Sequence, residues 1–168
     1  MPPQQGVFFE GELFDAHVLI SKIIKSANQS IFLFDNYIDE TVLTQLSKKN
    51  KGVTVKIYIK NISRQLELDV EKFNKQYGSL QVIEFDKSHD RFLIIDQTAI
   101  YHLGASLKDL GKKWFAFSKL LIDPALILGK LFDDKIEAIL GDPIPIAVVL
   151  IVGGVVLLFV DQYFKDKT

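Results

Sequence analysis

Residues 88–96, Ser88-His89-Asp90-Arg91-Phe92-Leu93-Ile94-Ile95-Asp96, join a polar loop to a short apolar run. The pattern predicts a buried strand that begins near Arg91 and ends at Asp96. In a strand, side chains two residues apart share a face, so His89 and Arg91 should project together near its start. An imidazole beside a guanidinium suits a phosphate group. Histidine acts as a nucleophile or proton carrier near neutral pH, and arginine offers a planar, permanently charged fork to phosphoryl oxygens.

Upstream of this strand, helical and strand patterns alternate. Apolar residues recur at helical spacing over residues 12–27, and Asp39 and Ser63 are suited to cap two further helices. Gly78 is suited to end the second of these helices. The runs with strand character are residues 30–35, 53–60 and 80–85.

Downstream, the sequence predicts strands at residues 99–104 and 114–120, then a helix from Pro124 to about residue 140. We expect Trp114, Phe115 and Phe117 to be core residues and residues 1–6 to be a linker. The resulting order, α-β-α-β-α-β-β-β-β-α, predicts an α/β fold in which helices pack on a mixed sheet.

The stretch at residues 89–96 resembles the His-x-Lys-x-x-x-x-Asp motif of the phospholipase D-like superfamily, with Arg91 in the lysine position. A Gly/Ser turn follows the neighbouring strand in that superfamily, and Gly104-Ala105-Ser106 occupies this place here. The resemblance covers roughly residues 7–120. Within it, residues 35–39 and 106–111 are similar to C-terminal domains of some bacterial and phage-type DNA-binding proteins.

The resemblance implies a metal-independent phosphodiesterase, a hydrolase without a cofactor, in which His89 attacks phosphorus and forms a phosphohistidine. Arg91 would hold the non-bridging oxygens and Ser106 would position the phosphate or the imidazole. Asp96 lies on the opposite face by alternation, so its expected role is structural or orienting. The sequence also offers candidates for substrate binding, which are Gly104, Lys108 and His102.

The resemblance also implies a homodimer, because the chemistry needs two histidines and the chain carries one copy of the motif. Two departures leave alternatives open. Arginine replaces lysine at Arg91, and Lys108 stands where an asparagine often follows the turn. The first interpretation is a nuclease-like enzyme, which Lys108 and nearby lysines favour. The second is a phosphate- or nucleic-acid-binding module without turnover, and the third is a membrane-tethered phospholipid phosphodiesterase.

Composition narrows the class of protein. A chain of 168 residues with 48% hydrophobic and 24% charged residues is typical of a globular domain. The net charge of −1 neither requires nor excludes a nucleic acid partner. There is no cysteine, so thiolate metal sites, disulfides and cysteine nucleophiles are excluded.

Residues 144–160 contain no charged residue and leave three interpretations open. The run is long enough for a short membrane segment. Gly153-Gly154 between two β-branched arms would also suit a β-hairpin, and a buried helix is the third possibility. We expect a phospholipase D-like domain at 1–120, a helical connector at 121–142 and this hydrophobic segment with a polar tail at 143–168. No secretory signal is recognisable, which predicts a cytoplasmic domain with or without a membrane anchor.

Overall fold

A computed structural model describes residues 3–131 of the chain. Within this range seven strands form one mixed sheet with the order β1-β7-β6-β5-β2-β3-β4. The strands are β1 (Gln5–Phe8), β2 (Ser30–Phe34), β3 (Thr54–Ile59), β4 (Leu80–Glu84), β5 (Arg91–Ile95), β6 (Ala99–Leu103) and β7 (Phe115–Leu120). Strands β2, β3 and β4 are parallel, whereas the remaining neighbours pair antiparallel. The predicted α/β class, a mixed sheet flanked by helices, is confirmed.

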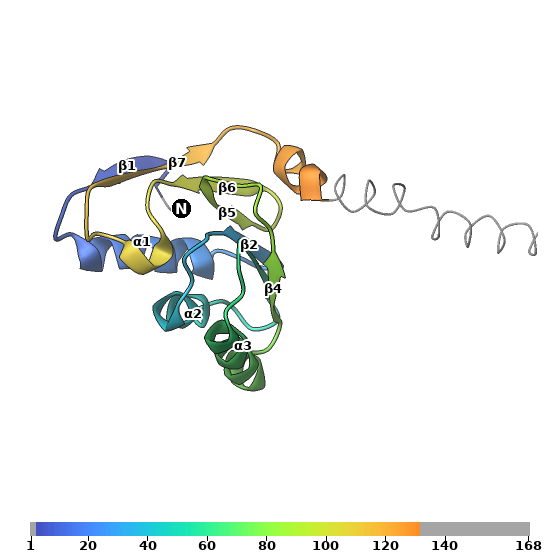
Figure 1. The fold of residues 1–168 in the computed structure, drawn as a ribbon. Coiled ribbons are helices and arrows are strands. Elements are labelled where there is room, and N and C mark those ends of the chain that lie inside the picture. Colours follow the sequence, from blue (N-terminus) through green and yellow to red (C-terminus); the bar gives the residue numbers. More distant parts are fainter. Residues whose placement is uncertain (1–2, 132–168) are drawn as a thin grey trace, which may run out of the picture. The chain divides into compact units, whose positions relative to one another are not determined.

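Three helices cover one face of the sheet (Figure 1). They are α1 (Leu13–Lys25), α2 (Glu40–Leu46) and α3 (Arg64–Tyr77). Each buries its apolar stripe against strand residues such as Leu33 and Leu93, which have no exposed surface. Burial of these side chains is the main source of the fold's stability.

The predicted helix caps are confirmed. The Asp39 side chain accepts hydrogen bonds from the backbone N–H groups of Thr41 and Val42, and Ser63 accepts one from Leu66. Gly78 ends α3 with a φ of 65°, a value that glycine adopts without strain.

The register of the sheet decides which loops meet. Strand β5 lies between β2 and β6 and runs antiparallel to both. Phe34, the last residue of β2, is opposite Phe92, while Arg91 is opposite Leu103, the last residue of β6. The segments that follow β2 and β6 therefore both meet the start of β5. At the other end of β5, Ile95 is opposite Ile31.

The prediction of a linker at residues 1–6 is wrong at Gln5 and Gly6, which begin β1. This edge strand pairs with β7, with Gln5 opposite Ser118. A four-residue strand that contains a glycine has weak intrinsic β-propensity, and its partner lies more than one hundred residues away in the chain. The pairing was therefore not visible in the local pattern.

The chain divides into two compact units, Met1–Pro124 and Ala125–Thr168. The first contains the whole sheet and its three helices. In the second, residues 125–131 are helical. None of the helices within residues 3–131 is both long and apolar enough to cross a membrane. The hydrophobic run at 144–160 lies outside the described residues.

Candidate active site

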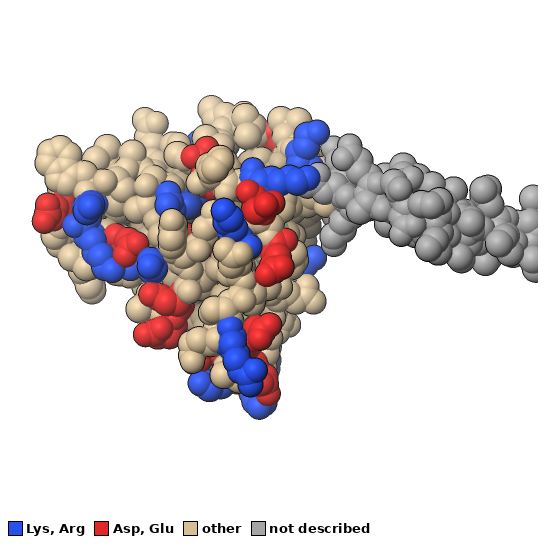
Figure 2. All heavy atoms as spheres, in the orientation of Figure 1, with Lys and Arg blue, Asp and Glu red and all other residues tan. Residues whose placement is uncertain are grey.

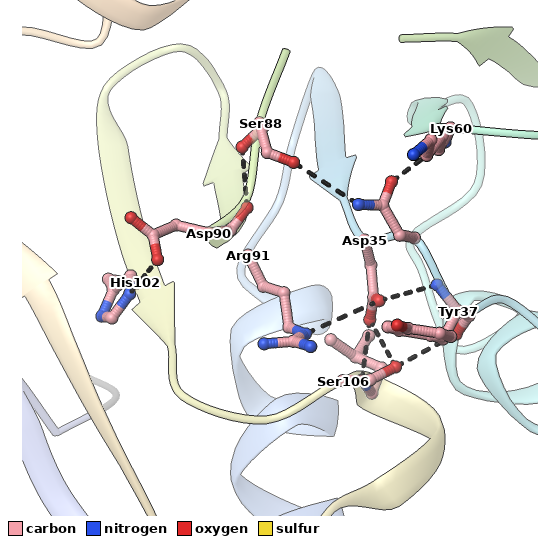
Figure 3. Close-up of polar contacts among 10 residues, drawn as sticks. Asp35, Tyr37, Lys60, Ser88, Asp90, Arg91, His102 and Ser106 are labelled. Carbon is pink, nitrogen blue, oxygen red and sulfur yellow. Dashed lines mark hydrogen bonds and ion pairs between the residues drawn. The ribbon is translucent and has the colours of Figure 1, made fainter. Parts of the chain in front are cut away.

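The candidate site lies at the sheet edge where β5 begins. The end of β2 leads directly into Asp35, and the end of β6 leads into the turn at Gly104-Ala105-Ser106. Because both segments border the start of β5, Asp35 and Ser106 come together beside Arg91 (Figure 3). Their separation in sequence is 71 residues, and their side chains are in direct contact.

A pocket of about 130 Å³ opens at this edge, lined by His89, Arg91, Asp35 and aromatic side chains that include Tyr58 and Phe85. His89 is exposed in the loop between β4 and β5. The structure thus brings His89 and Arg91 to one pocket, although His89 precedes the strand rather than belonging to it. A solvent-accessible imidazole next to a guanidinium can reach an external phosphate group.

Asn36 holds the loop that carries His89. Its Nδ2 donates to the Ser88 carbonyl at 3.4 Å, and its Oδ1 accepts from the backbone N–H of Lys60 at 2.9 Å (Figure 3). The Ser88 hydroxyl donates to the Asp90 carbonyl at 2.8 Å. These bonds connect the ends of β2 and β3 to the loop, so they restrict the positions that His89 can adopt.

The Asp35 carboxylate has no exposed surface. Its Oδ2 accepts hydrogen bonds from the Ser106 hydroxyl at 2.7 Å and the Leu107 N–H at 2.9 Å, and its Oδ1 accepts the Tyr37 N–H at 3.0 Å. Burial raises the pKa of Asp35, and it outweighs the opposing effect of these bonds and of the Arg91 charge. A buried acid of this kind is typical of functional sites.

Arg91 lies between this buried acid and the solvent. Its Nε is 3.9 Å from Asp35 Oδ1, and its side chain keeps 29% of its surface exposed. The Nε atom itself is buried and has no hydrogen-bond partner within residues 3–131. The ion pair is long, and the exposed part of the guanidinium can donate hydrogen bonds to an anion.

Asp96 lies at the opposite end of β5. Its carboxylate accepts hydrogen bonds from the backbone N–H groups of Asn28, Gln29 and Ser30 at 2.7–3.1 Å. Burial works to raise the pKa of Asp96, but these three amides hold it below its usual range. Asp96 thus fastens the connection between α1 and β2 and does not line the pocket around His89.

Ser106 is buried, and its hydroxyl contacts Asp35 Oδ2 and the Tyr37 carbonyl. Its effect on a ligand would act through Asp35 and Arg91. Gly104 packs against β7, because a Cβ there would lie 2.9 Å from the Ala116 carbonyl oxygen. Its N–H donates to the same oxygen at 2.9 Å. The need for glycine at this position is therefore explained by close strand packing.

The structure does not bring His102 into the pocket. His102 pairs with Phe92, so it projects from the face of the sheet opposite to that of Arg91. Its Nε2 lies 3.7 Å from Asp90 Oδ1 (Figure 3). Lys108 does lie near the site, with its Nζ 5.3 Å from the centre of the Tyr37 ring.

The sequence patterns did not single out Asp35 and Tyr37 as residues of the candidate site, although both line its pocket. An acid directly after a buried strand was a usable signal for Asp35, because such a position lies at a sheet edge. The prediction that Trp114 is a core residue is wrong, since 70% of its surface is exposed. The same prediction is confirmed for Phe115 and Phe117, which are buried. Trp114 precedes β7 and is therefore outside its alternation.

In the part of the chain that the structure describes, no group of three or more acidic or histidine side chains is placed to hold a metal ion. The side chains of the pocket around His89 offer an exposed imidazole, a partly exposed guanidinium and a buried acid.

The mixed α/β fold predicted from the sequence is shared with solved structures. The structure is similar to NucT from Helicobacter pylori, with a TM-score of 0.55 and 15% identity, over 79% of this chain and 94% of NucT. It is also similar to TrmBL2, an archaeal chromatin protein that binds DNA, with a TM-score of 0.51 and 18% identity, over 81% of this chain and 53% of that one. At these identities the likeness shows the fold.

No family model matches the sequence. Short stretches resemble undecaprenyl-diphosphatases. The one from Flavobacterium psychrophilum is 40% identical over 80 residues, which covers 42% of this chain and 31% of the relative. That from Porphyromonas gingivalis is 44% identical over 62 residues, or 36% of this chain and 22% of the relative. The chain thus spans less than a third of the length of these curated relatives.

Proposed function

We propose that the chain is a phosphodiesterase of the phospholipase D-like type that acts on nucleic acid through a phosphohistidine. The observation that carries the proposal is the pocket in which exposed His89 and the partly exposed guanidinium of Arg91 lie together. Phosphoryl transfer needs a nucleophile and a cation placed for the charge of the transition state, and these two side chains can supply both.

In the proposed reaction, a ring nitrogen of His89 attacks phosphorus and the bond from phosphorus to the leaving oxygen breaks. A second, protonated imidazole gives its proton to that oxygen. Water then attacks the phosphohistidine, its proton returns to the second imidazole, and the nitrogen–phosphorus bond breaks to free His89. Arg91 donates hydrogen bonds to the non-bridging oxygens in both steps.

The second imidazole is proposed to be His89 of the partner subunit in a homodimer. The described part of the chain supplies no other histidine to the pocket, since His102 projects from the opposite face of the sheet and His17 bonds to Gln45 on α2. A two-fold axis near the exposed His89 loop would place two such pockets face to face.

The test is hydrolysis of bis-p-nitrophenyl phosphate and of single-stranded DNA in EDTA by the wild-type protein and His89→Ala. We expect the substitution to lower the rate by about a thousandfold or more, because it removes the nucleophile. Its thermal unfolding should change little, because His89 is exposed in a loop. His17→Gln is the matched control and should remain active. Equal rates for wild type and a folded His89→Ala protein would contradict the proposal.

Mixed dimers test the shared site. Wild-type and His89→Ala chains with different tags are co-expressed, and the heterodimer is purified by two affinity steps. We expect it to be nearly inactive, because one histidine of the pair is missing. A heterodimer with half the wild-type rate would show that each chain works alone. A protein that binds DNA with no turnover would instead be the binding module without catalysis.

A membrane-tethered lipid phosphodiesterase is the second candidate. The uncharged run at 144–160 and the short likeness to undecaprenyl-diphosphatases favour it. If this second function is right, a cytoplasmic domain is attached to the membrane through the C-terminal segment. Deletion from residue 141 onward would then release the protein from the membrane fraction. Cleavage of phospholipid but not DNA would decide for it. A full-length chain that fractionates without membranes would decide against the tether.

A further inference from the structure

A second and larger pocket adjoins the candidate active site. Its volume is about 470 Å³, and Tyr37 and Arg91 line both pockets. This volume is within the range of roughly 300–1,000 Å³ that is usual for small-molecule sites. A group bound there would be a neighbour of a phosphate held by Arg91, so the second pocket is placed for another part of the same substrate.

The most unusual side chain of the second pocket is Trp114. Its surface is 70% exposed, although indole is a large apolar group that usually lies inside proteins. The ring of Phe9 packs against it edge to face, with ring centres 4.8 Å apart and planes at 87°. Phe9 thus restricts the orientation of the indole while much of its surface stays in contact with solvent. Such an oriented, exposed ring is suited to stacking on a planar ligand.

Basic side chains surround the two aromatic rings of this pocket. Four of the lining residues are basic and one is acidic, the basic ones being Arg91, Lys108, Lys112 and Lys113. The acid, Asp109, is paired with Lys112 at 2.7 Å. The Lys108 ammonium and the Arg91 guanidinium lie 5.3 and 5.9 Å from the centre of the Tyr37 ring. The pocket therefore has a net positive charge beside two aromatic rings.

This local excess of positive charge is not a general property of the surface. On the face shown in Figure 2, basic and acidic side chains are interspersed, and the whole chain has a net charge of −1. A ligand attracted by charge would therefore be selected by the pocket itself.

We propose that the second pocket is a nucleobase subsite that stacks a base of a single-stranded nucleic acid on Trp114 and Tyr37. This inference rests on the proposed function, since it takes the phosphodiester to be bound at Arg91 and His89. Lysines beside the rings would contact the flanking phosphates. A single strand is required because a base in a duplex is already stacked and paired, so its faces are not available. Stacking on aromatic rings tolerates any base, so the subsite would select strandedness rather than sequence.

The chain contains one tryptophan, so its fluorescence reports on this pocket alone. Full-length His89→Ala protein, which should not cleave its ligand, is titrated in EDTA with three probes. They are a short oligothymidylate, an abasic strand with the same number of phosphates, and a duplex of the same length. We expect oligothymidylate to quench Trp114 and to bind about tenfold tighter than the abasic strand. Equal affinity for the first two probes, or equal quenching by the duplex, would overturn the inference.

Substitutions of Trp114 test whether this side chain is the one that binds the base. In the same background Trp114→Ala should weaken binding of oligothymidylate by about tenfold and leave binding of the abasic strand unchanged, as measured by fluorescence anisotropy of labelled strands. Trp114→Phe should restore most of the affinity. Phe14→Ala is the matched control, because Phe14 is 79% exposed and lines neither pocket. Loss of a dimer in Trp114→Ala, seen by light scattering, would assign the ring to a protein contact and overturn the subsite.

The two proposals fail in different ways. If the wild-type protein cleaves bis-p-nitrophenyl phosphate but shows no preference for strands with bases, the subsite is wrong and the phosphodiesterase stands. If base-dependent binding is present and no diester is cleaved, the subsite stands and the catalytic proposal is wrong.

Discussion

The two ends of strand β5 satisfy their polar groups in opposite ways. At the end of the strand, the Asp96 carboxylate accepts hydrogen bonds from three consecutive backbone amides, and its pKa is held below the usual range. At the start, Arg91 Nε is buried without a hydrogen-bond partner within residues 3–131, and burial raises the pKa of Asp35 beside it. Arg91 and Asp96 are only five positions apart in the sequence.

The difference indicates that the two ends have different roles. A carboxylate with its full set of donors stabilises the folded state and has little left to offer a ligand. A guanidinium that makes only a long ion pair with a buried acid contributes less to stability, but its exposed part can bind an anion that arrives from solvent. The motif thus joins a structural end and a functional end through one rigid strand.

The largest expected effect comes from a substitution at the functional end, which is the start of β5. Arg91→Ala should lower phosphodiesterase activity by about a hundredfold, because it removes the donors to the non-bridging oxygens. Arg91→Lys should retain or exceed the wild-type rate, since lysine stands at this position in the motif of the superfamily. The measurement is the rate of diester hydrolysis in EDTA. Arg64→Ala, which removes an exposed arginine at the start of α3, is the control. Wild-type binding and turnover in Arg91→Ala would exclude contact between Arg91 and the phosphate.

The next largest effect comes from a substitution at the structural end, where Asp96 follows β5. Asp96→Ala should lower the free energy of unfolding by about 2 kcal/mol, because the amides of Asn28, Gln29 and Ser30 lose their acceptor. Activity per folded molecule should stay at the wild-type level. Urea unfolding and the diester assay measure the two quantities. A variant that is as stable as wild type but inactive would place Asp96 in the active site. The two ends of β5 would then not differ in role.

A smaller effect tests the connection from Ser106 to Arg91. Ser106→Ala should lower the free energy of unfolding by about 1.5 kcal/mol, since the buried Asp35 carboxylate loses a hydrogen bond of 2.7 Å. We also expect a lower rate with an unchanged KM for the diester, because Arg91 is then oriented less well. Ser88→Ala is a comparison within the neighbouring loop. If Ser106→Ala raises KM alone, the hydroxyl contacts the ligand directly.

The smallest expected effect is on how the free energy of unfolding depends on pH, to which Asp96 and Asp35 contribute with opposite sign. The folded-state pKa of Asp96 is lowered, so its stabilisation is present above the unfolded value of about 3.9 and is lost as pH falls through the folded pKa. The folded-state pKa of Asp35 is raised, so its favourable contribution is present below that unfolded value and is lost as pH rises through the folded pKa.

Asp96→Asn and Asp35→Asn should therefore change the pH dependence of stability in opposite directions. Relative to wild type, the free energy of unfolding of Asp96→Asn should be reduced more at neutral pH than in acid. For Asp35→Asn the free energy of unfolding relative to wild type should be higher at neutral pH than in acid. Urea unfolding from about pH 3 to about pH 7 measures both slopes. Slopes of the same sign would show that the two carboxylates have similar environments, contrary to the structure.

Much of this protein follows from its sequence alone. Hydrophobic periodicity predicted the three helices and six of the seven strands, and the caps at Asp39 and Ser63 were visible as residue types. The spacing of His89 and Arg91 predicted that both would meet at one site, and they do line one pocket, although His89 lies in the loop before β5 and not in the strand. Alternation predicted Asp96 on the opposite face, whereas in the structure Asp96 directly follows the last residue of β5.

Other features depended on pairings between distant segments. The contact of Asp35 with Ser106 and Arg91 follows from the antiparallel alignment of β2 and β6 with β5, which no local pattern shows. The same alignment turned His102 to the opposite face and gave Asp96 its amide partners. The exposure of Trp114 and the existence of β1 were likewise settled by the sheet. Local propensity and alternation act over a few residues, whereas register is set by how the whole sheet buries its apolar face against the helices.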